Sequence, residues 1–486
     1  MNQQTYIAGS LIPGAGRGFF ISSNVCAGDL IFAVNKPLLA ILDENTLTTT
    51  CDECLAYFGT MGRNVDLKGG IKYMKCEGCG VLSYCGKACK DNAWNSHHKY
   101  ECNIYKDIKD QESDADFKCT RIGSKRLRCI IRLLSLHKHK QISEADFKTF
   151  VKLAEGYQRR DSNWVHYTMN LFLKHGVTDL PLLELEHLIL AVANNECQLD
   201  TPNLLTSYQL KHYGTYQQVE PLPLGMCLEP HYSMINHSCT PNAFWTFEGR
   251  ELQVRAEKDI SAGEEILISY IPPGQFYERM EKLGNWGIKC LCERCQKGPI
   301  EPVGSLRGRL DKLLNDKPWF ENTKKVKIDT VKELINDMRS EGYGWGAWPM
   351  KSLFMTLYRC LRSRGDEVEM LKVLLRIRFS VEAEQEPKAF LSEKLETLRL
   401  LVAIMEQIGG HTESAGGVRE LVGNVSMGLR VELLREIETC YGSTSALARW
   451  ERRRFLEEIG DGKELEKGEF QAGLARLLAW ANISGE

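Results

Sequence analysis

Hydrophobic residues along this chain follow two alternating kinds of spacing. Residues 5–45 hold short apolar runs separated by turns, a pattern typical of β-strands, and similar signals return over residues 221–271. Between these regions, over about residues 103–215, apolar residues recur at helical spacing, and from about residue 300 the spacing is helical again. The pattern predicts a strand-rich core that is interrupted by helices and followed by a helical region.

The carboxy-terminal region shows the helical spacing clearly. Leu353, Leu357 and Leu361 fall at four-residue steps, which places them on one helix face. We expect five to seven helices here, packed in antiparallel pairs. A 34-residue repeat is not visible in this region, although its helical character resembles a tetratricopeptide-like domain.

A basic segment lies within the first helical region. Residues 118–140 hold eight Lys/Arg and no Asp/Glu, and Arg128, Arg132 and Lys138 alternate with apolar residues. This pattern predicts an amphipathic helix. Its basic side chains would either be solvated or face an acidic partner such as a nucleosome, and solvation is the favoured interpretation.

Composition narrows the class of protein. At about 100–200 residues per domain, 486 residues suggest two to four domains. The formal net charge of −2 argues against a protein devoted to nucleic-acid or membrane binding. The first residues lack a basic flank and an apolar run, and no stretch approaches the ~18 apolar residues of a membrane span. We therefore expect an intracellular protein, in the nucleus, the cytoplasm or both.

The cysteines are clustered. Of 18 in the chain, seven lie between Cys51 and Cys102, and three lie between Cys290 and Cys295. In a reducing compartment, clustered cysteines favour metal binding over disulfides. The remaining cysteines are expected to be mostly inert and buried.

The first cluster has the spacing of zinc ligands. Pairs of thiolates two or three residues apart allow one turn to present two sulfurs to one ion. His98 lies four residues before Cys102, so one helix face can carry both, whereas His97 is offset by five residues; we prefer His98, and His97 remains the competitor. The set is large enough for two tetrahedral zinc sites and consists of Cys51, Cys54, Cys76, Cys79, Cys85, Cys89, His98 and Cys102.

The same cluster resembles the MYND zinc finger. The resemblance rests on the spacing of Tyr84, Cys85, Cys89, Trp94, His98, Lys99, Glu101 and Cys102. It implies interleaved ligation, with one ion on Cys51, Cys54, Cys85 and Cys89 and the other on Cys76, Cys79, His98 and Cys102. Seven thiolates and two Zn²⁺ bring residues 51–102 to a net charge of about −2, which makes direct nucleic-acid binding unfavourable. The resemblance implies docking of proline-rich peptides, and a purely structural role is the alternative.

A second group of motifs is spread along the chain. Gly14–Gly18 is a glycine-rich turn, residues 236–242 read NHSCTPN, residues 263–270 read GEEILISY, and three cysteines follow at 290–295. In this order the motifs resemble a SET domain. Together with the finger, the chain resembles the SET-and-MYND family of protein lysine methyltransferases, which use S-adenosylmethionine.

The resemblance implies a role for individual residues. Tyr270 would be catalytic, with its ring walling the lysine channel and its hydroxyl orienting the amine or the methyl group. Cys239 would complete a third zinc site with Cys290, Cys292 and Cys295, giving three zinc ions in total. The expected cofactor-binding residues are Gly16, Arg17, Asn194, Asn236, His237 and Ile288.

The expected fold class is α+β, with a SET-domain β core, an inserted MYND finger, a post-SET zinc cap and an all-helical carboxy-terminal lobe. The expected boundaries are 5–50 and 221–271 for the SET core, 51–102 for the finger, 103–220 for a helical insertion, 272–298 for the post-SET segment and 300–486 for the lobe. The expected function is methylation of histone or non-histone lysines. The alternative is an adaptor that retains the SET fold and acts through finger-mediated binding; Ile288 favours it, because the family usually has an aromatic residue there.

Overall fold

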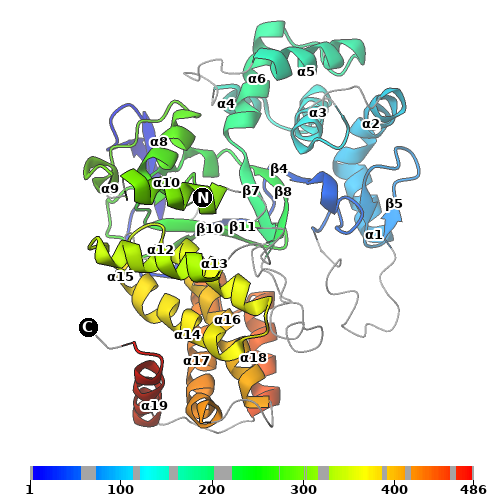
Figure 1. Cartoon of the computed structure of the whole chain (residues 1–486). Helices are drawn as coiled ribbons and strands as arrows, with labels where there is room; N and C mark the ends of the chain where they lie inside the picture. The colour runs from blue at the N-terminus through cyan, green and yellow to red at the C-terminus, as the bar shows by residue number, and fades with distance from the viewer. Residues whose placement is uncertain are drawn as a thin grey trace.

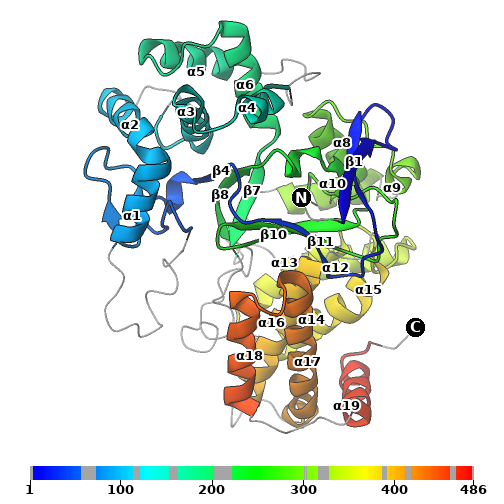
Figure 2. The same ribbon diagram turned by 180° about the vertical axis from the view of Figure 1, so that it is seen from behind.

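The computed structural model describes residues 4–55, 73–112, 121–152, 162–201, 222–272, 274–299, 302, 304–315, 328–385, 391–410, 417–459 and 467–483. In this part of the chain, small β-sheets occupy the middle of the molecule. Two helical regions lie at opposite ends of these sheets, and the two views agree on this arrangement (Figures 1 and 2).

Short strands form the β core. Within the described residues they assemble into two three-stranded sheets, β10-β11-β3 and β4-β8-β7, and two pairs, β1-β2 and β9-β12. The strands are β1 Thr5–Gly9, β2 Arg17–Ile21, β3 Leu30–Val34, β4 Leu39–Leu42, β7 Cys197–Thr201, β8 Leu222–Leu228, β9 Asn236–His237, β10 Ala243–Glu248, β11 Glu251–Ala256 and β12 Leu267–Ile268.

One of these pairings joins two of the sequence motifs. β9 and β12 run parallel, with Leu267 opposite Asn236 and Ile268 opposite His237. Because the pairing is in register, Tyr270 comes out of β12 beside the end of β9. Two motifs about thirty residues apart in sequence therefore meet at one point of the core.

The finger packs against the core at one side. It contains β5 Met74–Lys75, β6 Ser83–Tyr84, α1 Lys87–Ala93, a π-helical turn at Trp94–His98 and α2 Lys99–Gln111. Its buried residues belong to the same hydrophobic cluster as those of β4 and of the following helices. The described part of the finger therefore shares a core with the strands of the β core.

Four helices follow the finger: α3 Lys125–Lys138, α4 Glu144–Lys152, α5 Ser162–Lys174 and α6 Leu182–Asn194. The basic helix predicted within residues 118–140 is α3. Its predicted solvation is wrong for two of its arginines, because Arg128 and Arg132 are 1% and 2% exposed. Arg128 donates hydrogen bonds to the carbonyls of Leu42, Ile122 and Gly123. These two arginines face the protein interior and are unavailable to a nucleosome.

The carboxy-terminal lobe has its own hydrophobic core. The post-SET segment leads to it through α8 Phe276–Gly284 and α9 Glu293–Gln296. The lobe helices are α10 Gly304–Asn315, α12 Ile328–Ser340, α13 Met350–Arg362, α14 Glu367–Arg376, α15 Glu382–Glu384, α16 Leu391–Gly410, α17 Val418–Tyr441, α18 Ala446–Ile459 and α19 Lys467–Trp480.

The described lobe therefore holds nine helices, more than the five to seven expected. The excess includes α15, which is three residues long, and such an element is too short to show helical periodicity. Neighbours in sequence pack against one another, as α12 does on α13, α13 on α14 and α16 on α17. Among the described residues, no helix combines the length and apolarity needed to cross a membrane.

Candidate functional site

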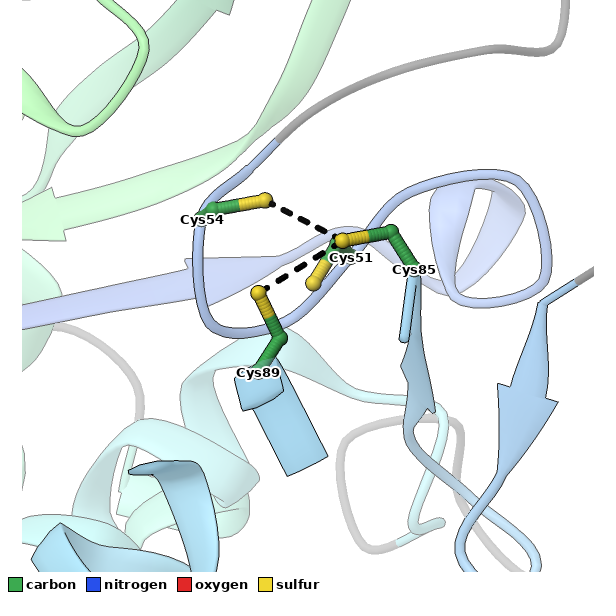
Figure 3. Close-up of side chains that lie close together, drawn as sticks. All are labelled: Cys51, Cys54, Cys85 and Cys89. Carbon is green, nitrogen blue, oxygen red and sulfur yellow. Dashed lines mark hydrogen bonds between the residues drawn. The ribbon is translucent and has the colours of Figure 1, made fainter. Parts of the chain in front are cut away.

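Four cysteine sulfurs converge at the start of the finger, as Figure 3 shows. Cys51 and Cys54 lie on the turn after strands β1–β4, whereas Cys85 and Cys89 flank the start of α1. The Cys85 sulfur is 3.7 Å from that of Cys54 and 3.5 Å from that of Cys89. A tetrahedral zinc ion with Zn–S bonds of 2.3 Å separates its sulfurs by about 3.8 Å, whereas a disulfide would require about 2 Å. The spacing fits a zinc ion.

The second cluster joins Cys76, Cys79, His98 and Cys102. The Cys76 and Cys102 sulfurs are 3.7 Å apart, and His98 Nε2 lies 3.2 Å from Cys76 Sγ and 3.6 Å from Cys79 Sγ. His98 therefore occupies the ligand position. His97 points elsewhere, with its Nε2 lying 3.3 Å from a carboxylate oxygen of Asp52.

A buried charge network surrounds the second cluster. Glu101 lies 3.2 Å from His98 Nδ1, so this nitrogen can donate to the carboxylate while Nε2 faces the sulfurs. Arg132 donates to Glu101 at 2.8 Å and to Asp52 at 3.0 Å. Burial raises the pKa of Glu101, but the positive charge of Arg132 and the hydrogen bonds from His98 and Arg132 together outweigh it and bring that pKa to about 2. The network fixes the orientation of the His98 ring.

The third cluster connects the β core to the post-SET segment. Cys239 follows β9, and Cys290, Cys292 and Cys295 lie before and within α9. The Cys239 sulfur is 3.9 Å from that of Cys290 and 3.5 Å from that of Cys295. Like the first set, these four thiols have the donor type and separation that suit zinc.

Each of the three clusters can hold one zinc ion, because its ligand atoms lie within 4.8 Å of one another. The structure brings together the three ligand sets that the sequence and the family resemblance suggested. The described residues contain no further group of this kind.

A cavity of about 1190 Å³ opens between the amino-terminal loop, the end of α6, the β9–β12 pair and the post-SET segment. Gly16 lies in the loop beside it, with a positive φ of 74°, next to Arg17. The other expected site residues line the cavity, namely Arg17, Asn194, Asn236, His237, Tyr270 and Ile288. Residues separated by more than 250 positions in the sequence therefore meet around one space.

Tyr270 and His237 hold each other in place. His237 Nδ1 accepts a hydrogen bond from the Tyr270 backbone N–H at 3.0 Å, and its Nε2 lies 3.3 Å from the Cys239 sulfur. Burial lowers the pKa of His237 to about 4, so the ring is neutral at physiological pH. The Tyr270 hydroxyl donates to the Ile235 carbonyl at 2.5 Å, and its ring meets Trp286 edge-on at 6.1 Å. His237 thus links the tyrosine to the third cluster.

The carboxy-terminal lobe also contributes to the cavity. Cys440 and Tyr441, in the last turn of α17, are among the residues that line it. No motif in the sequence pointed to either residue. Gly442 marks the end of a helix, but nothing in the local sequence indicates which surface that end contacts.

A SET domain family model matches residues 16–271. This chain belongs to the SET-domain family. The predicted α+β fold class is confirmed, because the chain combines a SET domain of small β-sheets with three Cys/His clusters and a helical carboxy-terminal lobe.

Several curated relatives of this chain have names that mention both a SET domain and a MYND finger. The chain is 24% identical to the SET domain and MYND-type zinc finger protein 6 of Schizosaccharomyces pombe, over 71% of this chain and 62% of the relative. It is 26% identical to the N-lysine methyltransferase SMYD2-B of Danio rerio, over 62% and 63%. It is 25% identical to the histone-lysine N-methyltransferase SMYD3 of Mus musculus, over 58% and 59%.

The matches span about three fifths of the length of these relatives. The predicted membership of the SET-and-MYND family is confirmed. SET methyltransferases take their methyl group from S-adenosylmethionine, which agrees with the predicted organic cofactor. The three Cys/His clusters agree with the predicted zinc ions.

Proposed function

We propose that this chain is an S-adenosylmethionine-dependent protein-lysine N-methyltransferase that acts on histone or non-histone lysines. The convergence of Arg17, Asn194, Asn236, His237 and Tyr270 on one cavity carries the proposal. The names of the relatives point the same way, because they include both an N-lysine and a histone-lysine methyltransferase.

The cavity suits the cofactor in size and chemistry. Small-molecule sites usually measure about 300–1,000 Å³, so a cavity of about 1190 Å³ leaves room for a lysine side chain beside a cofactor. Asn194 and Asn236 supply polar groups, whereas Ile288 and Trp286 supply apolar surface. S-adenosylmethionine carries an activated methyl group on a sulfonium.

Tyr270 is the proposed catalytic residue. Its hydroxyl hydrogen is directed at the Ile235 carbonyl, so the hydroxyl oxygen can accept an N–H from an entering lysine amine. A lysine has a pKa of about 10.4 in water and must lose a proton before it can attack. The Tyr270 and Trp286 rings exclude water from the amine, and this desolvation lowers its pKa.

The finger is proposed to bind proline-rich peptides. Trp94 is 47% exposed on the π-helical turn, and an exposed indole offers a flat apolar surface for proline rings. The partners of the chain would then be a protein substrate at the cavity and a docking peptide at the finger. A nuclear or cytoplasmic location fits both kinds of partner.

Transfer of labelled methyl groups onto histones and cell-extract proteins tests this function. We expect the wild-type chain to transfer methyl to lysine, and Tyr270→Phe to lose about 100-fold or more of the rate, because the positioned oxygen is removed. Tyr277→Phe is the matched control, since Tyr277 is 60% exposed on α8. Undiminished transfer by Tyr270→Phe would refute its role. A wild-type chain that binds no S-adenosylmethionine and transfers no methyl would favour the adaptor.

A further inference from the structure

Glu265, in the GEEILISY motif, is buried at 5% exposure and gathers several hydrogen bonds near the cavity. Its Oε1 accepts from the Ser10 hydroxyl at 2.8 Å and from Asn236 Nδ2 at 2.7 Å. Its Oε2 accepts from the Leu11 backbone N–H at 2.9 Å. The carboxylate thereby joins the amino-terminal loop to the first residue of the NHSCTPN motif.

These bonds determine which way the Asn236 amide faces. An asparagine nitrogen has two hydrogens, and its oxygen has none. Asn236 Nδ2 lies 2.7 Å from the Glu265 carboxylate and 2.9 Å from the Arg17 carbonyl, both of which can only accept. The nitrogen must therefore face these two groups. Asn236 also lines the cavity, so its Oδ1, an acceptor, is the atom left for a ligand there.

The position of Glu265 depends on a close approach to β2. A Cβ on Gly18 would lie 2.1 Å from Glu265 Oε1, nearer than real Cβ contacts allow. The Glu265 backbone is held as well, because its carbonyl accepts from Asn242 Nδ2 at 2.8 Å. The Glu265 carboxylate is thus held in place by its close packing on β2 and by the hydrogen bond that anchors the Glu265 backbone.

We propose that Glu265 is a positioning residue that sets the orientation of the Asn236 amide, so that the cavity presents a hydrogen-bond acceptor to the ammonium group of the cofactor's amino-acid portion. This inference rests on the proposed function. Glu265 acts through Asn236 and does not touch the cofactor itself.

A glutamine at this position removes one of the two acceptor-only partners of the Asn236 nitrogen and leaves the Arg17 carbonyl as the other. Its side-chain amide can donate as well as accept, so the Asn236 amide can rotate by a half-turn and still be bonded. The rotated amide would present N–H groups to a ligand ammonium, and two donors facing each other cannot form a hydrogen bond. Loss of one hydrogen bond to a charged group corresponds to about a 10- to 100-fold rise in Kd.

Calorimetric titration of the full zinc-loaded chain with two ligands tests the proposal. S-adenosylmethionine carries the amino-acid portion, whereas methylthioadenosine lacks it. We expect Glu265→Gln to raise the Kd of S-adenosylmethionine about 10- to 100-fold and to leave that of methylthioadenosine unchanged. Glu264→Gln is the matched control, because the neighbouring carboxylate is exposed and accepts from the Ser261 N–H.

Gly18→Ala provides a second route, since its new Cβ displaces the Glu265 carboxylate while the charge is kept; we expect the same selective loss. Equal weakening of both ligands by Glu265→Gln would show a general structural role and overturn the proposal. Unchanged binding of S-adenosylmethionine by Glu265→Gln would overturn it as well. A wild-type chain that binds neither ligand would instead contradict the proposed function, and this inference with it.

Discussion

Arg132 is a charged residue whose position decides how the finger is attached. It is 2% exposed, on α3, and it faces two carboxylates of the finger, Asp52 and Glu101. Removing a guanidinium and two carboxylates from water is costly, and their mutual attraction offsets this cost as long as all partners are present. The arrangement therefore makes the finger depend on α3.

Replacing Arg132 by an apolar residue of similar length leaves the two carboxylates buried without their cation. We expect Arg132→Met to destabilise the finger by about 3–5 kcal/mol. Thermal unfolding and the rate of zinc release to a chelator measure the effect. Lys138→Met on the same helix is the control, because Lys138 pairs with Asp179 at the surface and such pairs contribute little. Equal stability of the two variants would contradict the network.

The burial of Arg132 could not be predicted from its sequence neighbours. Glu101 and Asp52 lie 31 and 80 residues before it, and the basic composition of α3 favours a solvated face. The zinc ligands are different, because short Cys-x2-Cys and His-x3-Cys spacings are local geometry that a turn or helix fixes by itself. The spacing therefore indicated which residues bind zinc, and the family resemblance implied how they divide into sets, but neither indicated the charges that support them.

At the scale of elements, the two-residue pairing of β9 with β12 positions the site. So short a pair has little stability of its own, and the third cluster holds it from one side through Cys239. A zinc ion there would join β9 to α9. It would thereby connect the His237–Tyr270 contact to the post-SET segment.

Removal of Cys239 tests this link. We expect Cys239→Ala to bind two zinc ions per chain where the wild type binds three, and to lose methyl transfer, because Tyr270 is no longer held. Elemental analysis of the purified proteins gives the zinc content. Cys26→Ala, at an exposed cysteine outside the clusters, should keep both zinc and activity. Three zinc ions in Cys239→Ala would contradict the assignment of the third site.

Elements with strong local signals were predictable. The β10–β11 hairpin turns at Gly249-Arg250, where a glycine follows an aromatic run, as the strand pattern indicated. The three-residue helix α15 gave no such signal, because it is shorter than one helical turn. The strands β9 and β12 lie within the predicted strand region, but two residues span a single alternation, which is too little to locate them. Their existence depends on tertiary contacts.

At the scale of the whole molecule, the lobe and the SET core meet at the end of α17. Arg255, on β11, donates to the Tyr441 carbonyl at 3.3 Å and to the Gly28 carbonyl at 3.1 Å. Gly442 has a φ of 87°, and a Cβ there would lie 2.6 Å from the Arg255 guanidinium, so glycine suits this contact. This contact holds Cys440 and Tyr441 at the cavity wall. It joins Arg255 to Tyr441, which lie nearly 200 positions apart in the sequence.

This cavity, enclosed by the SET core, the post-SET segment and the lobe, is the proposed binding site of S-adenosylmethionine. Calorimetric titration of the wild-type, zinc-loaded chain with S-adenosylmethionine tests it most directly. We expect saturable binding of one cofactor per chain, competed by S-adenosylhomocysteine, because one cavity contains all the expected cofactor-binding side chains. A chain that holds three zinc ions and gives no binding heat at several temperatures would contradict it.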